Sequence, residues 1–201
     1  MKRSDRKEMK ILGITGGIGS GKSEILKFLQ KAYGAYVSPL DDVARRLQKS
    51  GQECFDRIVE SFGPEILGPD GELDRGRLGA IVFSDSEKLA VLNGIVHPGV
   101  KQWVQQDILQ KEMEGVRLYV VESALFPYVE YRDICEEMWY VYAKESVRRQ
   151  RLLQSRHYTE EKIERIRKSQ PSEQAFRDIC TAVIDNSGAF ENTKKQIGEL
   201  L

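Results

Sequence analysis

Eight consecutive residues near the start of the chain are suited to binding a phosphate chain. They run from Gly16 to Ser23 and fit the pattern G-x-x-x-x-G-K-[S/T]. Glycines let the backbone curl so that its N–H groups surround an anion, and Lys22 can reach the β- and γ-phosphates of a nucleoside triphosphate. Ser23 offers a hydroxyl to Mg²⁺ at the start of the next helix, whose N-terminus favours negative charge. The motif predicts a nucleotide site made of Gly16, Gly17, Ile18, Gly19, Ser20, Gly21, Lys22, Ser23 and Glu24.

The segments on either side of this loop are those that a phosphate-binding loop requires. Residues 11–15 form a short apolar run, which is typical of a buried strand. Residues 24–33 place apolar side chains at the spacing of one helix face. A glycine-rich turn that only joins a strand to a helix is the structural alternative, and this flanking context argues against it.

The rest of the chain alternates predicted strands with predicted helices. Four further apolar runs, at residues 35–38, 117–122, 138–143 and 181–185, predict strands. Within these runs the apolar residues are continuous rather than alternating, which favours a parallel sheet covered by helices on both faces. We therefore expect a doubly wound α/β fold with five parallel strands.

The gap between the second and third predicted strands is too long for one crossover helix. Residues 52–62 have a helical pattern, and Asp74 is placed to cap the start of another helix. The His97-Pro98 pair is expected to break a later helix, because proline lacks the backbone N–H that a helix needs. We expect a helical subdomain, at about residues 42–115, that is inserted in the sheet and holds a second substrate.

Composition limits the function classes that remain. The 201 residues are 40% hydrophobic and 31% charged, as in a soluble globular domain, and no apolar run approaches the ~18 residues of a membrane span. Residues 1–9 are a charged extension without the apolar segment of a secretory signal, so we expect a cytoplasmic protein, monomeric or weakly homo-oligomeric, without membrane partners. Basic and acidic residues are equal in number, at 31 each, which argues against general nucleic-acid binding. Three widely spaced cysteines suggest neither a zinc site nor disulfides.

A cluster of arginines follows the fourth predicted strand, within helical residues 145–170. One interpretation is a lid that lays one or two arginines over the phosphates during transfer, with Arg148 and Arg156 as candidates. The other is a solvated helix face carrying ion pairs four residues apart, such as Glu161 with Arg165. The sequence leaves both interpretations open.

A phosphate-binding loop occurs in kinases, GTPases, motors and transporter ATPases. The N-K-x-D motif with which GTPases read guanine is absent, and the D-x-x-G match at residues 185–188 follows the last strand rather than the third. We therefore favour a small-molecule kinase. A kinase acting on a nucleoside or nucleotide, and a nucleotide-binding regulator without catalysis, are the alternatives.

Four segments taken together resemble the dephospho-CoA kinase family. They are the loop with its preceding strand, residues 37–45, the His97-Pro98 pair and residues 183–188. The resemblance spans residue 10 to the C-terminus and implies an adenylate-kinase-like domain over residues 10–201, with strand order 2-3-1-4-5, an acceptor-binding subdomain and a lid. It also implies that MgATP phosphorylates the ribose 3′-hydroxyl of dephospho-CoA, the last step of coenzyme A synthesis.

Asp41 is the candidate general base. A ribose hydroxyl is a weak nucleophile, and a carboxylate at the end of a strand beside the loop can orient it and take its proton. The family pattern D-A-D-x-x-A-R aligns on Ala44 and Arg45, so that Asp41 is its second aspartate and Pro39 replaces the first. Arg45 joins Asp41 in the implied acceptor site. The competing interpretation is that Asp41 caps a helix beginning near Val43, and both can hold at once.

Further site residues come from the same resemblance. In the family the His-Pro pair lies by the acceptor, so His97 is a candidate contact to dephospho-CoA, the alternative being a hydrogen-bonded structural histidine. Asn186 and Gly188 follow the fifth strand, where the adenine of ATP is expected. Glu122 ends the third strand and is placed to orient a Mg²⁺-bound water, although the chain departs here from the family's P-L-L-F-E segment.

Overall fold

The computed structural model describes residues 9–124 and 131–201, which divide into two compact units. The first unit comprises the chain up to Ser38 and from Lys111 onward, and the second comprises Pro39–Gln110. Within the described ranges, no helix combines the length and the apolar character needed to cross a membrane.

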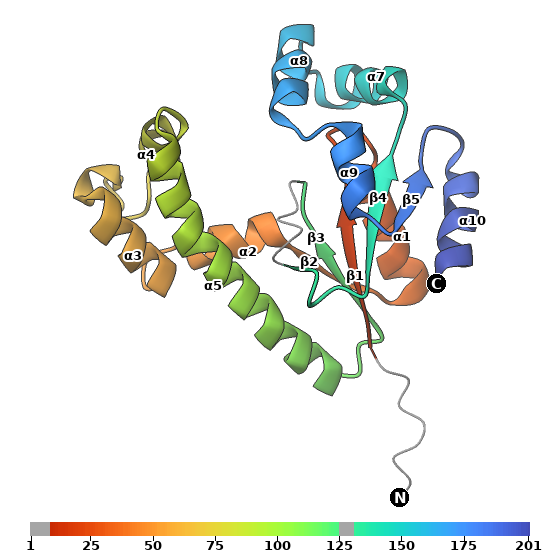
Figure 1. The fold of residues 1–201 in the computed structure, drawn as a ribbon, viewed down its shortest axis with the longest axis horizontal. Coiled ribbons are helices and arrows are strands. Elements are labelled where there is room, and N and C mark those ends of the chain that lie inside the picture. Colours follow the sequence, from red (N-terminus) through yellow and green to blue (C-terminus); the bar gives the residue numbers. More distant parts are fainter. Residues whose placement is uncertain (1–8, 125–130) are drawn as a thin grey trace, which may run out of the picture. The chain divides into compact units, whose positions relative to one another are not determined.

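The first unit is built on a five-stranded parallel sheet, which confirms the predicted fold class (Figure 1). The strands are β1 (Lys10–Thr15), β2 (Tyr36–Pro39), β3 (Leu118–Glu122), β4 (Glu137–Tyr142) and β5 (Ala182–Asp185). Their order is β2-β3-β1-β4-β5, as the resemblance implied. The central strand β1 pairs with β3, where Lys10 lies opposite Leu118, and with β4, where Leu12 lies opposite Glu137. Central placement of β1 puts the loop that follows it in the middle of the sheet's carboxyl edge.

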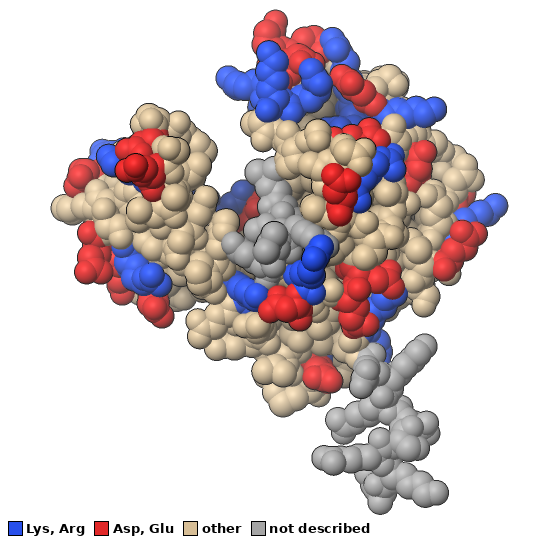
Figure 2. Space-filling view, viewed as in Figure 1, with Lys and Arg blue, Asp and Glu red and all other residues tan. Residues whose placement is uncertain are grey.

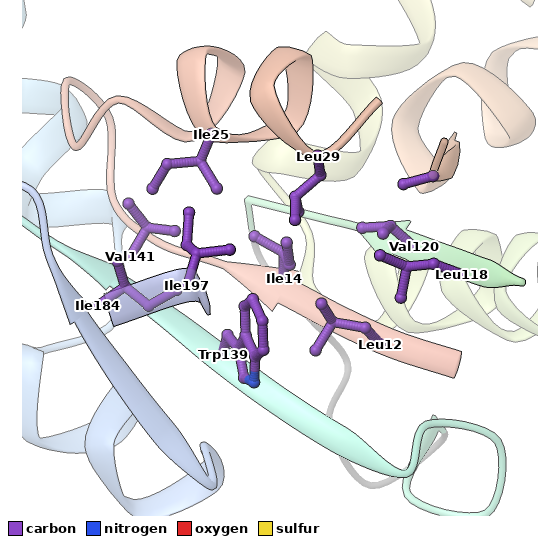
Figure 3. Packing of buried hydrophobic residues seen from close by; sticks show 11 residues of the cluster. Leu12, Ile14, Ile25, Leu29, Leu118, Val120, Trp139, Val141, Ile184 and Ile197 are labelled. Atoms are coloured by element: carbon purple, nitrogen blue, oxygen red, sulfur yellow. The ribbon is translucent and has the colours of Figure 1, made fainter. Parts of the chain in front are cut away.

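One face of the sheet is covered by α1 (Lys22–Tyr33) and α10 (Phe190–Leu200). Successive strand side chains point to opposite faces, so one set of them from each strand meets these helices. Figure 3 shows Ile25 of α1 above Ile14 of β1 and Trp139 of β4, and all three side chains are fully buried. This apolar layer fixes β1 and α1 on both sides of the loop that joins them.

The opposite face carries α9 (Glu173–Ile179). The ring of Phe176 stacks on that of Tyr140 in β4, with centroids 4.9 Å apart and planes 10° from parallel. Ser172 caps the start of α9 by accepting a hydrogen bond from the backbone N–H of Ala175 at 3.1 Å. The sheet is therefore covered on both sides, as its continuous apolar strands require.

Two helices follow β4 and form the segment predicted as a lid: α7 (Glu145–Arg156) and α8 (Glu160–Ser169). The hydroxyl of Thr159 caps α8 by accepting a hydrogen bond from the N–H of Lys162 at 3.3 Å. Lysine and arginine side chains gather over these helices, with acidic side chains between them (Figure 2).

The second unit is helical. Its elements are α2 (Leu40–Leu47), α3 (Glu53–Phe62), the 3₁₀ helix η1 (Pro64–Ile66), α4 (Arg75–Phe83) and most of α5 (Ser86–Met113). The predicted cap is confirmed, since Asp74 accepts hydrogen bonds from the N–H groups of Gly76 and Arg77 at 2.9 and 3.0 Å. These bonds, that from Arg77 first, lower the pKa of Asp74. The cap is therefore strongest when Asp74 is ionised and weakens as the pH falls through its lowered pKa.

The expected break at His97-Pro98 is wrong, because α5 runs through both residues. The helix persists because apolar side chains are buried before and after the proline, namely Ile95, Val96, Val100 and Val104. Helix α3 packs at this point: the Cys54 thiol donates to the Ile95 carbonyl at 3.8 Å, and a Cβ on Gly99 would lie 2.6 Å from Cys54 Sγ. Packing outweighs the penalty of about 3 kcal/mol for an internal proline.

Candidate active site

The loop between β1 and α1 has a shape that requires glycine at two positions. Gly19 has a φ of 77° and Gly21 a φ of 93°, both in the left-handed region that side chains disfavour. A Cβ on Gly19 would also lie 2.9 Å from the backbone oxygen of Arg148, and one on Gly21 would collide with the side-chain amide of Asn186. Backbone conformation and close packing therefore both require glycine at positions 19 and 21.

A cavity of about 690 Å³ opens at this loop. It is lined by residues 17–24 of the loop and α1, together with Lys27, Glu122, Ala124, Arg151, Leu152 and Gln170. Ser23 and Glu24 are exposed in the first turn of α1, whose N-terminus opens on the cavity. A space of this size accommodates a nucleotide, and its floor presents backbone N–H groups and a helix N-terminus to an anion.

Lys22 lies among the charged groups of this cavity. Its ammonium group donates a hydrogen bond to the Gly16 carbonyl at 2.5 Å and lies 3.9 Å from the carboxylate of Glu122 at the end of β3. The Lys22 and Glu122 side chains are only 12% and 16% exposed. The cavity thus places the positive charge of Lys22 beside the carboxylate oxygens of Glu122, which is the combination needed to hold a phosphate and its counter-cation.

Arg148 contacts the loop from α7 but does not line this cavity. Its Nε donates to the Ile18 carbonyl at 2.9 Å, and a Cβ on Gly17 would lie 2.5 Å from its guanidinium nitrogen. The side chain lines a second cavity of about 340 Å³ beside β4 and α9. The structure therefore brings Arg148 to the loop, where it supports the backbone.

Arg151, one helical turn further along α7, lines the first cavity. It donates hydrogen bonds to the backbone oxygens of Ser20, at 3.2 Å, and Asn186, at 2.9 Å. This side chain joins the loop after β5 to the phosphate loop. Sequence reasoning missed Arg151, because four arginines within nine residues carry no signal of which one faces the loop.

The Asn186 side chain braces the loop from the residue that follows the edge strand β5, at the same carboxyl edge of the sheet. It is 1% exposed, its amide nitrogen donates to the Ser20 carbonyl at 2.9 Å, and its amide oxygen accepts from the Thr193 hydroxyl at 2.9 Å. Burial leaves only the neighbouring backbone, such as that of the exposed Gly188, open to a ligand.

The other arginines and acids of α7 and α8 behave differently from Arg148 and Arg151. Arg149 pairs with Glu160 at 2.8 Å and Arg167 with Glu164 at 3.1 Å, between side chains that are about half exposed. These pairs fit the solvated-face interpretation. The Arg156 side chain lies outside the part of the chain that the structure describes.

Asp41 is not a helix cap. Helix α2 begins at Leu40, with Pro39 in the N-cap position, so Asp41 lies inside the first turn. The extended backbone of Pro39 and the burial of Leu40 set this start, three residues before Val43, near which the helix was predicted to begin. The capping interpretation is wrong, and the exposed carboxylate of Asp41 needs another explanation.

The other acceptor-site candidates lie in the second unit with Asp41. Arg45 of α2 is exposed and pairs with Asp42 at 2.9 Å, one turn earlier on the same helix. His97 is half-buried within α5. The second unit thus carries Asp41, Arg45 and His97, whereas the first carries the phosphate loop.

Burial leaves the cysteines poorly suited to act as nucleophiles. Desolvation raises the pKa of both Cys135 and Cys180 to about 12. Burial also raises the pKa of Cys54, a residue of α3 that packs against α5. All three thiols are free and stay protonated at neutral pH.

Gln170 is the second residue that sequence reasoning missed. It lines the nucleotide cavity, and its side-chain oxygen accepts a hydrogen bond from the Ile18 N–H at 3.0 Å. A single glutamine 152 residues from the loop gives no local signal; its place before Pro171, where a helix must end, is the only hint in the sequence.

Comparisons with known proteins agree with this arrangement. A family model described as dephospho-CoA kinase matches residues 10–192. A dephospho-CoA kinase of Carboxydothermus hydrogenoformans is 35% identical, covering 95% of this chain and 92% of that protein. One of Halalkalibacterium halodurans is 36% identical, covering 95% and 94%.

Solved structures share the fold. A crystal structure from Thermus thermophilus has a TM-score of 0.79 at 29% identity and covers 96% of this chain and 97% of its own. Dephospho-CoA kinase from Campylobacter jejuni has a TM-score of 0.69 at 20% identity, with 96% and 98% covered. Shikimate kinase from Acinetobacter baumannii has a TM-score of 0.52 at 14% identity, with 96% and 93% covered, and shares the fold alone. The match over residues 10–192 and the full-length relatives show that this chain belongs to the dephospho-CoA kinase family.

Proposed function

We propose that the chain transfers the γ-phosphoryl group of ATP to the ribose 3′-hydroxyl of dephospho-CoA, giving coenzyme A and ADP. Family membership supports the reaction and both substrates. The structural observation that carries the proposal is the cavity of about 690 Å³ in which Lys22, Ser23 and the N-terminus of α1 face the same space.

The ATP phosphates lie, in this proposal, along the loop from Gly16 to Glu24. Backbone N–H groups and Lys22 neutralise the phosphate oxygens, and the exposed hydroxyl of Ser23 is a ligand for Mg²⁺. Oxygen donors are those that Mg²⁺ prefers, so Ser23 and the nearby Glu122 carboxylate, acting through water, suit it. The bound cation would offset charge on the β- and γ-phosphates. The adenine contacts the backbone near Asn186 and Gly188.

Dephospho-CoA is held by the second unit, Pro39–Gln110. Asp41 accepts the proton of the 3′-hydroxyl as its oxygen attacks the γ-phosphorus, and its exposed carboxylate is open to a ligand. Arg45, held toward the start of α2 by Asp42, and His97 of α5 contact the acceptor. The pyrophosphate of dephospho-CoA is a group that an arginine recognises well.

Residues 145–170 form a lid in this proposal. Arg151 contacts the transferring phosphate, since it already lines the nucleotide cavity. Arg148 and Arg156 were the candidates from sequence; Arg148 holds the loop backbone at Ile18, and Arg156 stays a candidate. An arginine at the transferring group stabilises charge that develops in the transition state.

We expect a cytoplasmic protein, monomeric or weakly homo-oligomeric, that binds neither membranes nor nucleic acid. The equal numbers of basic and acidic residues support the last point. Size-exclusion chromatography over a range of concentrations tests the oligomeric state.

An acceptor panel tests the proposed reaction. ADP release from MgATP is followed with dephospho-CoA, with nucleosides and with nucleotides, using Lys22→Ala as the control for contaminating kinases. We expect dephospho-CoA alone to stimulate release strongly. Preference for a nucleoside or nucleotide would identify a different kinase, and tight ATP binding without turnover on any acceptor would identify a regulator.

A further inference from the structure

Gln170 stands at a point where the chain has little freedom. Helix α8 ends at Ser169, and Pro171 forces the residue before it into an extended backbone, with φ −94° and ψ 153° at Gln170. Ser172 then caps α9. The linker between the two helices thus consists of a helix end, a proline and a cap. These constraints restrict the backbone at Gln170 and so the direction of its half-buried side chain.

That side chain closes a ring of hydrogen bonds with the phosphate loop. Gln170 Oε1 accepts from the Ile18 N–H at 3.0 Å and from the Arg148 guanidinium at 3.4 Å. Arg148 Nε in turn donates to the Ile18 carbonyl at 2.9 Å. Both polar groups of one loop residue are therefore held by the lid segment, one by α7 and one by the linker after α8.

Gln170 also lines two cavities. It borders the nucleotide cavity of about 690 Å³ and, with Arg148 and Tyr140, the second cavity of about 340 Å³. There is no room for a Cβ on either side of Ile18, because Gly17 and Gly19 both lie against Arg148. Flexible glycines on both sides make external support of the Ile18 peptide important.

We propose that Gln170 is a positioning residue for phosphoryl transfer: it fixes the Ile18 peptide and Arg148, so that the phosphate loop is shaped before ATP binds. The inference rests on the proposed function for its kinetic consequence. Its mechanism is preorganisation, because a loop already ordered loses less conformational freedom when the nucleotide binds. Gln170 acts through the loop and through Arg148 and needs no contact with the reacting atoms.

Gln170→Met tests the inference, because methionine has similar length and no strong acceptor. Gln174→Met in α9 is the matched control: Gln174 is exposed and bonds Asp178 four residues along its own helix. In the ATP-free chain we expect hydrogen exchange at the Ile18 amide to be at least about fivefold faster in Gln170→Met and unchanged in Gln174→Met. We also expect the KM for ATP to rise roughly 5- to 30-fold, as for the loss of one or two hydrogen bonds, with the KM for dephospho-CoA unchanged.

A double variant adds a test that a merely structural role would not pass. Gln170→Met and Arg148→Met disrupt the same ring of hydrogen bonds around Ile18. Their combined effect on the KM for ATP should therefore be clearly smaller than the product of the single effects. Multiplying effects, or unchanged exchange and KM in Gln170→Met, would overturn the inference. If Gln170→Met has a lowered melting temperature, Gln170→Asn, which keeps the amide but cannot reach, takes its place with the same expected exchange. Exchange is measured without any substrate, so a wild-type chain inactive on dephospho-CoA refutes the proposed function and leaves this measurement decisive.

Discussion

The phosphate loop and helix α2 carry the two halves of the proposed reaction, and they are built differently. The loop is supported from far along the chain: Arg148, Arg151, Gln170 and Asn186 all bond its backbone. The functional side chains of α2 are exposed, and Arg45 has a partner only one turn away on the same helix. Long-range support fixes one half, whereas local contacts leave the other adjustable.

This difference indicates where each half is completed. A loop whose Ile18 and Ser20 carbonyls are held by distant side chains presents a preformed anion site to ATP. In the proposed function, the exposed acidic and basic side chains on α2 gain defined partners when the acceptor binds. Variants of side chains that only brace the loop should therefore affect ATP binding or fold stability, and variants of α2 should affect the chemical step without destabilising the protein.

The largest effect is expected for Asp41→Asn. Removing the carboxylate that we propose accepts the ribose proton should lower kcat roughly 10²- to 10⁴-fold, the usual contribution of a general base. Asp41 does not cap α2, so the melting temperature and the affinity for ATP should change little. Steady-state kinetics with thermal unfolding measure both. Asp42→Asn, one residue along, should be nearly silent, and an active Asp41→Asn enzyme would remove Asp41 as the base.

Lys22→Ala should have the next largest effect. Loss of a cation at the transferring phosphate typically costs about 10²- to 10³-fold in rate. Kinetic assays measure the loss of turnover, and circular dichroism checks that the variant is folded. We expect a normal fold because Lys22 lines the cavity and not the core. Normal turnover in this variant would mean that ATP does not react at the loop.

The two arginines of α7 should differ from each other. Arg151 lines the nucleotide cavity and Arg148 does not, so Arg151→Ala should lower kcat by about 10- to 100-fold and Arg148→Ala by less. Arg151→Lys, which keeps the charge, should recover part of the loss. A greater kcat loss in Arg148→Ala than in Arg151→Ala would reverse the roles given to them.

Asn186→Ala should change stability more than chemistry. It removes a buried amide that donates to the Ser20 carbonyl and accepts from the Thr193 hydroxyl, and each such hydrogen bond contributes about 0.5–1.5 kcal/mol. Urea unfolding should show this loss, whereas Asn192→Ala, at an exposed site on α10, should stay within about 0.5 kcal/mol of wild type. Equal stability of the two variants would show that the loop does not depend on this brace.

Sequence reasoning succeeded where structure depends on neighbouring residues. The phosphate loop, the five strands and the cap at Asp74 were predicted from contiguous patterns, because a motif, an apolar run or a cap acts within a few residues. The strand order came from the family resemblance, since no local pattern encodes which strands pair.

The failures share a cause, which is packing between distant segments. Helix α5 continues through Pro98 because α3 packs against it at Gly99, and α2 starts early because Leu40 is buried. Arg151 and Gln170 join the site through bonds to residues more than 100 positions away. No spacing rule along the chain reports such contacts.

The most direct test of the account is a phosphorus-31 NMR spectrum of the products formed from MgATP and dephospho-CoA. We predict one new phosphomonoester on the ribose 3′ carbon of the acceptor for each ADP released, formed about 10²- to 10³-fold more slowly with Lys22→Ala. ADP release without a new phosphomonoester, or a phosphate on any other position, would contradict the central claim that this chain is a 3′-hydroxyl kinase for dephospho-CoA.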